Sequence, residues 1–145
     1  MRPPQVVLAF DFGLKRIGIA SGDTLTKAAA PRAAVGVGGS GPDWEAIARE
    51  VRALAPGRLV VGAPYNVDGS ESALTQAARG FAAELARRFA LPVQLVDERY
   101  SSLEAGAALK SRRASGQRRR RVRRGDVDSA AAAVILGRFL RGEGN

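Results

Sequence analysis

The sequence contains no cysteine and no histidine in its 145 residues. Without cysteine the chain cannot form a disulfide bond, which fits a reducing compartment. Without histidine it cannot build a Ser-His or Cys-His nucleophilic pair, and it lacks the usual proton carrier near neutral pH. Both absences together remove nearly every type of zinc site. Any chemistry must therefore rely on carboxylates, amines, guanidinium groups, hydroxyls or backbone. Carboxylates alone favour hard cations such as Mg²⁺ or Mn²⁺.

Long hydrophobic runs are also missing near the start of the chain. The apolar run at residues 6–10 is too short for the core of a signal peptide or for a membrane span. A length of 145 residues with 46% hydrophobic composition suits a single domain, residues 1–145, whose core takes up Trp44 and the five Phe. We therefore expect a cytoplasmic protein without a membrane partner, either a monomer or a homodimer.

Acidic residues are outnumbered, because 14 Asp and Glu face 23 Lys and Arg and leave a net charge of +9. Such an excess indicates a polyanionic partner, and nucleic acid is the leading candidate. An alternative is a GC-rich source that encodes arginine freely, since only Lys15, Lys27 and Lys110 are lysines.

Arginines crowd residues 111–125, a segment without apolar periodicity. Like charges at this density repel one another unless an anion is present, and the guanidinium group suits two-pronged contact with phosphate. We expect this loop to grip backbone phosphates, chiefly through Arg118, Arg119, Arg120 and Arg121. A loop that is merely solvated is the alternative.

The hydrophobic pattern predicts an α/β fold. Short apolar runs bounded by turn residues predict strands, whereas apolar residues that recur every three or four positions predict helices. The predicted strands are residues 6–10, 15–21, 28–37, 58–62 and 92–96. The predicted helices are residues 44–55, a helix from near Ser70 to Phe89, one that starts at Ser101, and residues 126–140. Three adjacent strands followed by alternation predict a mixed five-stranded sheet with helices on both faces.

Asp11 follows directly on the first predicted strand. Strand alternation places Val7, Ala9 and Asp11 on one face, where a carboxylate is costly unless it is paired, hydrogen-bonded or bound to metal. An aspartate that caps its own turn, helped by Gly13, explains the position equally well.

Asp97 and Glu98 follow directly on the strand at residues 92–96. Neighbouring strand residues face opposite ways, so one of the two acids faces the Asp11 side, and alternation alone does not say which. Taken by itself, this pair with Arg99 is better explained as a salt-bridge cluster.

Asp126 and Asp128 stand at the start of the last predicted helix. We expect Asp126 to be its N-cap. Asp128 shares a helix face with apolar residues and should therefore point inward, although the helix dipole alone could also favour an Asp there. That face comprises Ala131, Ala132, Ile135 and Phe139. Two strand ends and one helix start can bring carboxylates together to hold one or two divalent cations for phosphodiester hydrolysis.

Four segments, in order, resemble the motifs of the YqgF family, also called RuvX, a RuvC-like group of the ribonuclease H superfamily. They are DFGLKRIGIA at residues 11–20, VGAPYNVDGS at 61–70, VDERYSS at 96–102 and DSAA at 128–131. The resemblance implies a ribonuclease H-like fold and a metal-dependent nuclease with Asp11, Glu98 and Asp128 as its catalytic, metal-binding acids. It thereby selects Glu98 over Asp97.

The family is linked to processing of the 5′ end of the 16S ribosomal RNA precursor, and some members to Holliday junctions. The resemblance therefore implies a nuclease acting on structured RNA, with a resolvase acting on branched DNA as the nearest alternative. A non-catalytic RNA-binding assembly or transcription factor is the alternative of another class. An ATPase of the sugar-kinase type needs two such domains, which 145 residues cannot supply.

Further residues are candidates for contact with nucleic acid. Lys15, Arg16 and Arg99 could bind substrate phosphates near the metal, or they could instead pair with the acids. The glycine-containing loop at residues 62–70 leads into a predicted helix, and helix N-termini suit phosphate. In that loop, Asn66 and Ser70 are the candidates.

Overall fold

The computed structural model describes residues 3–64, 66, 68–97 and 124–142. Its strands form one six-stranded sheet in the order β4-β3-β2-β1-β5-β6. The strands are β1 (Val6–Asp11), β2 (Arg16–Asp23), β3 (Ala29–Gly38), β4 (Gly41–Pro42), β5 (Arg58–Ala63) and β6 (Val93–Asp97). The helices are α1 (Trp44–Leu54), α2 (Ala73–Phe89) and α4 (Arg124–Leu140).

The sheet is mixed, as predicted. From β1 to β4, each strand pairs antiparallel with the next one in the chain. β5 pairs parallel with β1, and β6 pairs parallel with β5. The predicted count of five strands is one too low, because β4 has only two residues and so shows no alternation to detect. The helix predicted from Ser101 lies outside the described residues.

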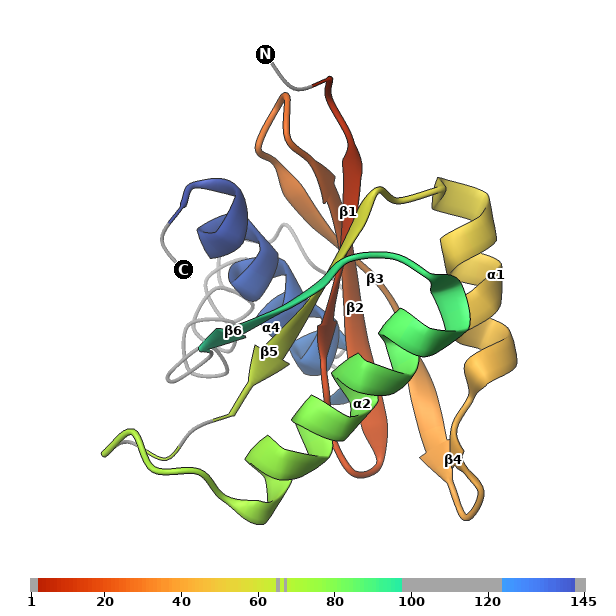
Figure 1. The fold of residues 1–145 in the computed structure, drawn as a ribbon, viewed down its shortest axis with the longest axis vertical. Helices are drawn as coiled ribbons and strands as arrows, with labels where there is room; N and C mark the ends of the chain where they lie inside the picture. The colour runs from red at the N-terminus through yellow and green to blue at the C-terminus, as the bar shows by residue number, and fades with distance from the viewer. Residues whose placement is uncertain (1–2, 65, 67, 98–123, 143–145) are drawn as a thin grey trace, which may run out of the picture.

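Two layers of helices cover the sheet (Figure 1). Leu8 and Phe10 of β1 pack in a cluster with α1 and α2, whereas Val7 and Ala9 pack with α4 on the opposite face. β1 is therefore buried on both sides, and each fully buried large side chain contributes roughly 1.5–3 kcal/mol to folding. The same alternation continues to Asp11 and places it on the α4 face.

The aromatic residues expected in the core are found there. The Phe81 ring of α2 lies 5.6 Å from the ring of Phe10, 5.1 Å from that of Phe12 and 5.4 Å from that of Trp44. These contacts fasten α1 and α2 to the end of β1. No helix among the described residues is both long and apolar enough to cross a membrane.

Two helix starts differ from the predicted ones. α2 begins after its N-cap Ser72 rather than near Ser70, because Ser72 and Thr75 form a reciprocal capping box. α4 already includes Arg124, so Asp126 lies inside its first turn and is not the predicted N-cap. Each start is displaced by about two residues, which is the usual uncertainty of a helix boundary.

The Ser72 cap makes a prediction about stability. Its side chain accepts a hydrogen bond from the Thr75 backbone N–H at 3.2 Å. We expect Ser72→Ala to lower the free energy of unfolding by about 1 kcal/mol, because an N–H at the helix start loses its partner. Urea unfolding followed by circular dichroism measures the change. Ser40→Ala, in an exposed turn, is the control and should unfold like the wild type.

Candidate active site

Asp11 is the last residue of β1 and lies between two glycines. Its register partner is Gly18 on β2 and Gly62 on β5. Neither neighbour carries a side chain, so another element can approach the sheet backbone beside Asp11 on the α4 face. This half-buried carboxylate is placed where sequence alternation predicted it.

The start of α4 lies directly against Gly18. A Cβ atom at Gly18 would be 2.0 Å from the carbonyl oxygen of Asp128 and 2.7 Å from the backbone nitrogen of Ser129. Only glycine permits this approach of helix to strand. Because Gly18 is also the partner of Asp11, the helix brings Asp128 to the strand position next to Asp11.

A side-chain hydrogen bond accompanies this contact. The pairing of β2 with β3 shifts register between Ile17 and Ile19, and the Ile19 N–H donates to the Ser129 hydroxyl at 3.4 Å. The predicted inward face of the helix is confirmed at Ala131, Ala132 and Ile135, which are fully buried, whereas Phe139 is half-buried. The small residues allow the close approach and thereby position Asp128.

Arg16 pairs with Asp128. The Arg16 Nε donates to an Asp128 carboxylate oxygen at 2.8 Å, with 35% and 27% of the two side chains exposed. Pairing with an acid was one of the two roles open to Arg16, and this structure shows it. An ion pair with this much solvent contact contributes only about 0–1 kcal/mol, so a cation or a phosphate can replace either partner at small cost.

Asp97 lies on the other face of the sheet from Asp11. On β6, Leu95 packs with the α1 and α2 cluster and Val96 with the α4 cluster. Alternation therefore places Asp97, the partner of Ala63 on β5, on the α2 side. Glu98 and Arg99 lie outside the described residues, as do Arg118 to Arg121. Within the part of the chain that is described, no three His, Cys, Asp or Glu residues form a metal-binding group.

The loop after β5 holds the candidate residues Asn66 and Ser70 together. The Asn66 side-chain amide donates to the Ser70 hydroxyl at 3.0 Å, and the Asn66 N–H donates to the Ser70 carbonyl at 2.9 Å. Asp68 accepts from both the Ser70 N–H at 2.9 Å and the Ser70 hydroxyl at 2.6 Å. A phosphate that binds Ser70 must therefore displace a carboxylate.

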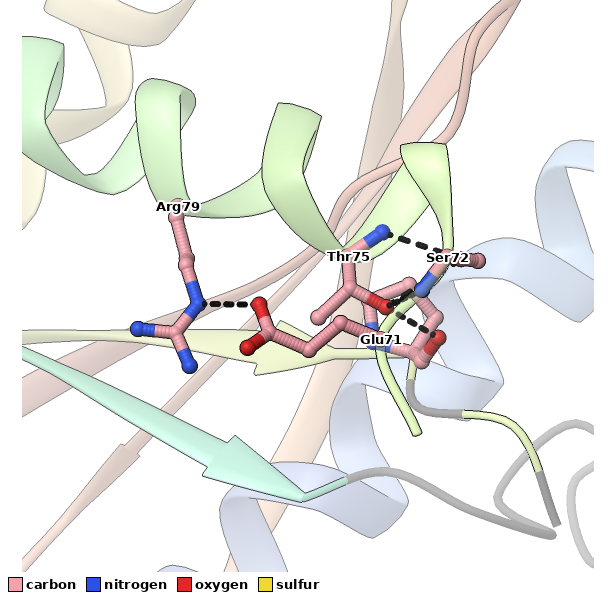
Figure 2. Close-up of polar contacts among 5 residues, drawn as sticks. Glu71, Ser72, Thr75 and Arg79 are labelled. Atoms are coloured by element: carbon pink, nitrogen blue, oxygen red, sulfur yellow. Dashed lines mark hydrogen bonds and ion pairs between the residues drawn. The ribbon is translucent and has the colours of Figure 1, made fainter. Parts of the chain in front are cut away.

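Thr75 is a structural residue that the sequence patterns did not reveal. It is fully buried, and its hydroxyl donates to the Pro64 carbonyl at 2.9 Å, which ties the end of β5 to α2. Figure 2 shows this region, where Arg79 also pairs with Glu71 at 2.9 Å. The signal available was a threonine three residues after a serine, the spacing of a capping box.

These groups lie at one end of the sheet, where β1 and β5 end and β2 begins. In Figure 1 the turn after β1, the end of β5 and the start of α2 lie toward the lower end of the view. Lys15 is exposed in that turn. The described part of the site thus combines two carboxylates, one arginine and one lysine near the same end of the sheet.

Comparison with known proteins gives consistent results. The profile of a family described as "RuvX: Holliday junction resolvase" matches residues 5–142. A relative from Xanthomonas campestris pv. campestris (strain 8004), named "Putative pre-16S rRNA nuclease", is 44% identical over 140 residues, covering 97% of this chain and 90% of the relative. A relative of the same name from Xanthomonas axonopodis pv. citri (strain 306) is 43% identical over 140 residues, with the same coverage.

Solved structures share the fold. T. thermophilus RuvC in complex with a Holliday junction substrate superposes with a TM-score of 0.55 at 18% identity, covering 97% of this chain and 98% of RuvC. The yeast mitochondrial Holliday junction resolvase Ydc2 gives a TM-score of 0.52 at 10% identity, covering 94% and 78%. At these identities the likeness concerns the fold alone, and it confirms the predicted ribonuclease H-like architecture.

Proposed function

Because the chain belongs to the RuvX family, we propose that it is a metal-dependent nuclease that processes the 5′ end of the 16S ribosomal RNA precursor. The nuclease class is supported by the names of relatives 44% identical over nearly the whole chain. The observation that carries the chemistry is that the Asp128 backbone packs on Gly18, the register partner of Asp11 on the neighbouring strand. Its net charge of +9 suits a polyanionic substrate.

The donor set fits a divalent cation of the Mg²⁺ or Mn²⁺ type. Asp11 and Asp128 offer only oxygen ligands, and the chain has no His or Cys that would favour zinc. We propose Glu98 as the third acid, because Asp97 belongs to the opposite face of the sheet. When bound, the cations would activate water and stabilise the charge that develops on the phosphate and leaving oxygen.

The chain's own residues would prepare the reaction. Asp11, fixed at the end of a strand buried on both faces, and Asp128, held against Gly18, provide preorganised ligands. Arg16 neutralises Asp128 in this structure. With Asp128 engaged as a cation ligand, the Arg16 guanidinium would be available to hold a substrate phosphate. Lys15 and the arginines at 99 and 118–121 would bind flanking phosphates.

A resolvase that cuts branched DNA is the second candidate. The family description favours it, since it names a Holliday junction resolvase. A carboxylate site of this kind can hydrolyse either nucleic acid, so substrate choice must come from groups around the acids.

The decisive experiment compares substrates, ions and one inactivated site. A fragment of precursor 16S rRNA and a four-way DNA junction are each incubated with wild type and Asp11→Asn in Mg²⁺, Mn²⁺ or Ca²⁺. We expect the wild type to cut the RNA at its 5′ region with Mg²⁺ or Mn²⁺, and Asp11→Asn to cut at least ~10³-fold more slowly. Cleavage of the junction alone selects the resolvase.

Two results would contradict the proposal. Equal cleavage by Asp11→Asn would remove the metal role of this carboxylate. Binding without cleavage of either substrate under every ion would instead favour an RNA-binding assembly or transcription factor.

A further inference from the structure

The turn between β1 and β2 exposes a leucine beside the site. Leu14 is 69% exposed, and it lies between the two strand ends that carry Asp11 and Arg16. A single exposed leucine is ordinary on a protein surface and needs no explanation by itself. What distinguishes Leu14 is its position beside the proposed site. It follows Asp11 by three residues and precedes Arg16, the partner of Asp128, by two.

The turn is held in place by contacts on each side. The Phe12 ring lies 5.1 Å from the Phe81 ring in the core. A Cβ atom at Gly13 would lie 2.6 Å from the Arg16 carbonyl oxygen, so the turn closes tightly. The Lys15 carbonyl accepts a hydrogen bond from the Val37 N–H of β3 at 2.9 Å. Leu14 is therefore presented to solvent by a well-anchored backbone.

Lys15 borders an open groove. The groove has a volume of about 550 Å³ and runs between Lys15, the β3–β4 hairpin and Trp44 at the start of α1. Asp43 also lines it, but its carboxylate accepts the Ala46 N–H at 3.1 Å and caps α1. Among the described residues that line the groove, Lys15 is the cationic one.

We propose that this turn positions the substrate strand: Leu14 packs against an unstacked nucleobase beside the scissile phosphate, and Lys15 contacts the phosphate of a nucleotide in the groove. Apolar side chains inserted beside bases stabilise unstacked nucleotides, and lysine supplies the charge that a phosphate requires. The proposal rests on the nuclease function proposed above. It assigns to Leu14 and the groove a part in choosing substrates with unpaired bases.

The chain contains its own control at the opposite end of the sheet. The β2–β3 turn, at the top of Figure 1, carries Leu25, which is 72% exposed, and Lys27, also exposed. This turn is ordered too, because Asp23 accepts the Thr26 N–H at 2.7 Å and the Leu25 N–H at 2.9 Å. These hydrogen bonds, the one from Thr26 foremost, hold the pKa of Asp23 below its usual value. Both turns thus carry an exposed leucine and an exposed lysine on a backbone that is held by hydrogen bonds.

The test compares Leu14→Ala with Leu25→Ala, and Lys15→Gln with Lys27→Gln. The probe is the precursor 16S rRNA fragment, or the DNA junction if the wild type cuts that instead, with 2-aminopurine placed in turn at each nucleotide flanking the cut. Binding is measured in Ca²⁺ over a series of KCl concentrations, and kcat and KM are measured in Mg²⁺. Circular dichroism checks that each variant is folded.

We expect Leu14→Ala to weaken binding roughly tenfold and to lose the 2-aminopurine fluorescence increase at one position, since the base loses its apolar contact. A plot of log affinity against log salt concentration should be less steep for Lys15→Gln. The difference in slope should correspond to the loss of about one phosphate contact. Leu25→Ala and Lys27→Gln should match the wild type in every measurement.

If Leu14→Ala and Lys15→Gln behave like their controls while the wild type cuts, this proposal and the phosphate contact of Lys15 are wrong, whereas the nuclease activity stands. If the wild type neither binds nor cuts either nucleic acid, the proposed function fails and this proposal fails with it.

Discussion

Gly18→Ala is expected to lower the free energy of unfolding by roughly 3 kcal/mol, the upper part of the range for overpacked cores. The added methyl would lie 2.0 Å from the Asp128 carbonyl oxygen, and a helix backbone cannot give way as a flexible side chain can. α4 must therefore move off β2. That movement would carry Asp128 away from Asp11, so we expect cleavage to fall even under conditions in which the variant is folded.

Urea unfolding and cleavage rates measure the two effects. Gly36→Ala on β3 is the control for stability, because nothing lies within 4 Å of a Cβ atom there. Its free energy of unfolding should change by less than about 1 kcal/mol. If both variants unfold like the wild type, the close contact with Gly18 does not position α4.

The second large effect concerns which acidic residues hold the proposed metal ions. We expect Asp128→Asn to slow cleavage by ~10³-fold or more, which corresponds to at least about 4 kcal/mol of lost transition-state stabilisation. Asp126→Asn, two residues earlier on the same helix, should cleave within about threefold of the wild type. The difference follows from helical geometry, because residues two apart point to different sides of a helix.

The same comparison applies at the end of β6. Glu98→Gln should lose cleavage as Asp128→Asn does, whereas Asp97→Asn should retain it. Single-turnover rates at saturating Mg²⁺ separate loss of chemistry from loss of binding. An Asp97→Asn variant that is inactive beside an active Glu98→Gln would reverse the assignment of the third acid.

Local patterns predicted most of the fold because the periods of strands and helices are properties of neighbouring residues. The apolar run of β1 and the alternation that leads to Asp11 are examples. Prediction was weakest where the local signal is short. β4 has two residues, and the start of α2 was placed near Ser70 although Ser72 is the cap. In both places the outcome depends on one or two hydrogen bonds rather than on a repeated pattern.

The sequence by itself determined the chemistry that is open to this protein. Without His and Cys, only carboxylates can form its cation site, and four ordered motifs identify the family. Only the tertiary structure decided which groups meet. Arg16 and Asp128 are 112 residues apart, yet they touch because Gly18 has no side chain and lets α4 lie against β2. Asp97 faces away from Asp11 because of the register of β6. Contacts of this kind depend on how separate elements pack, and local periodicity carries no information about them.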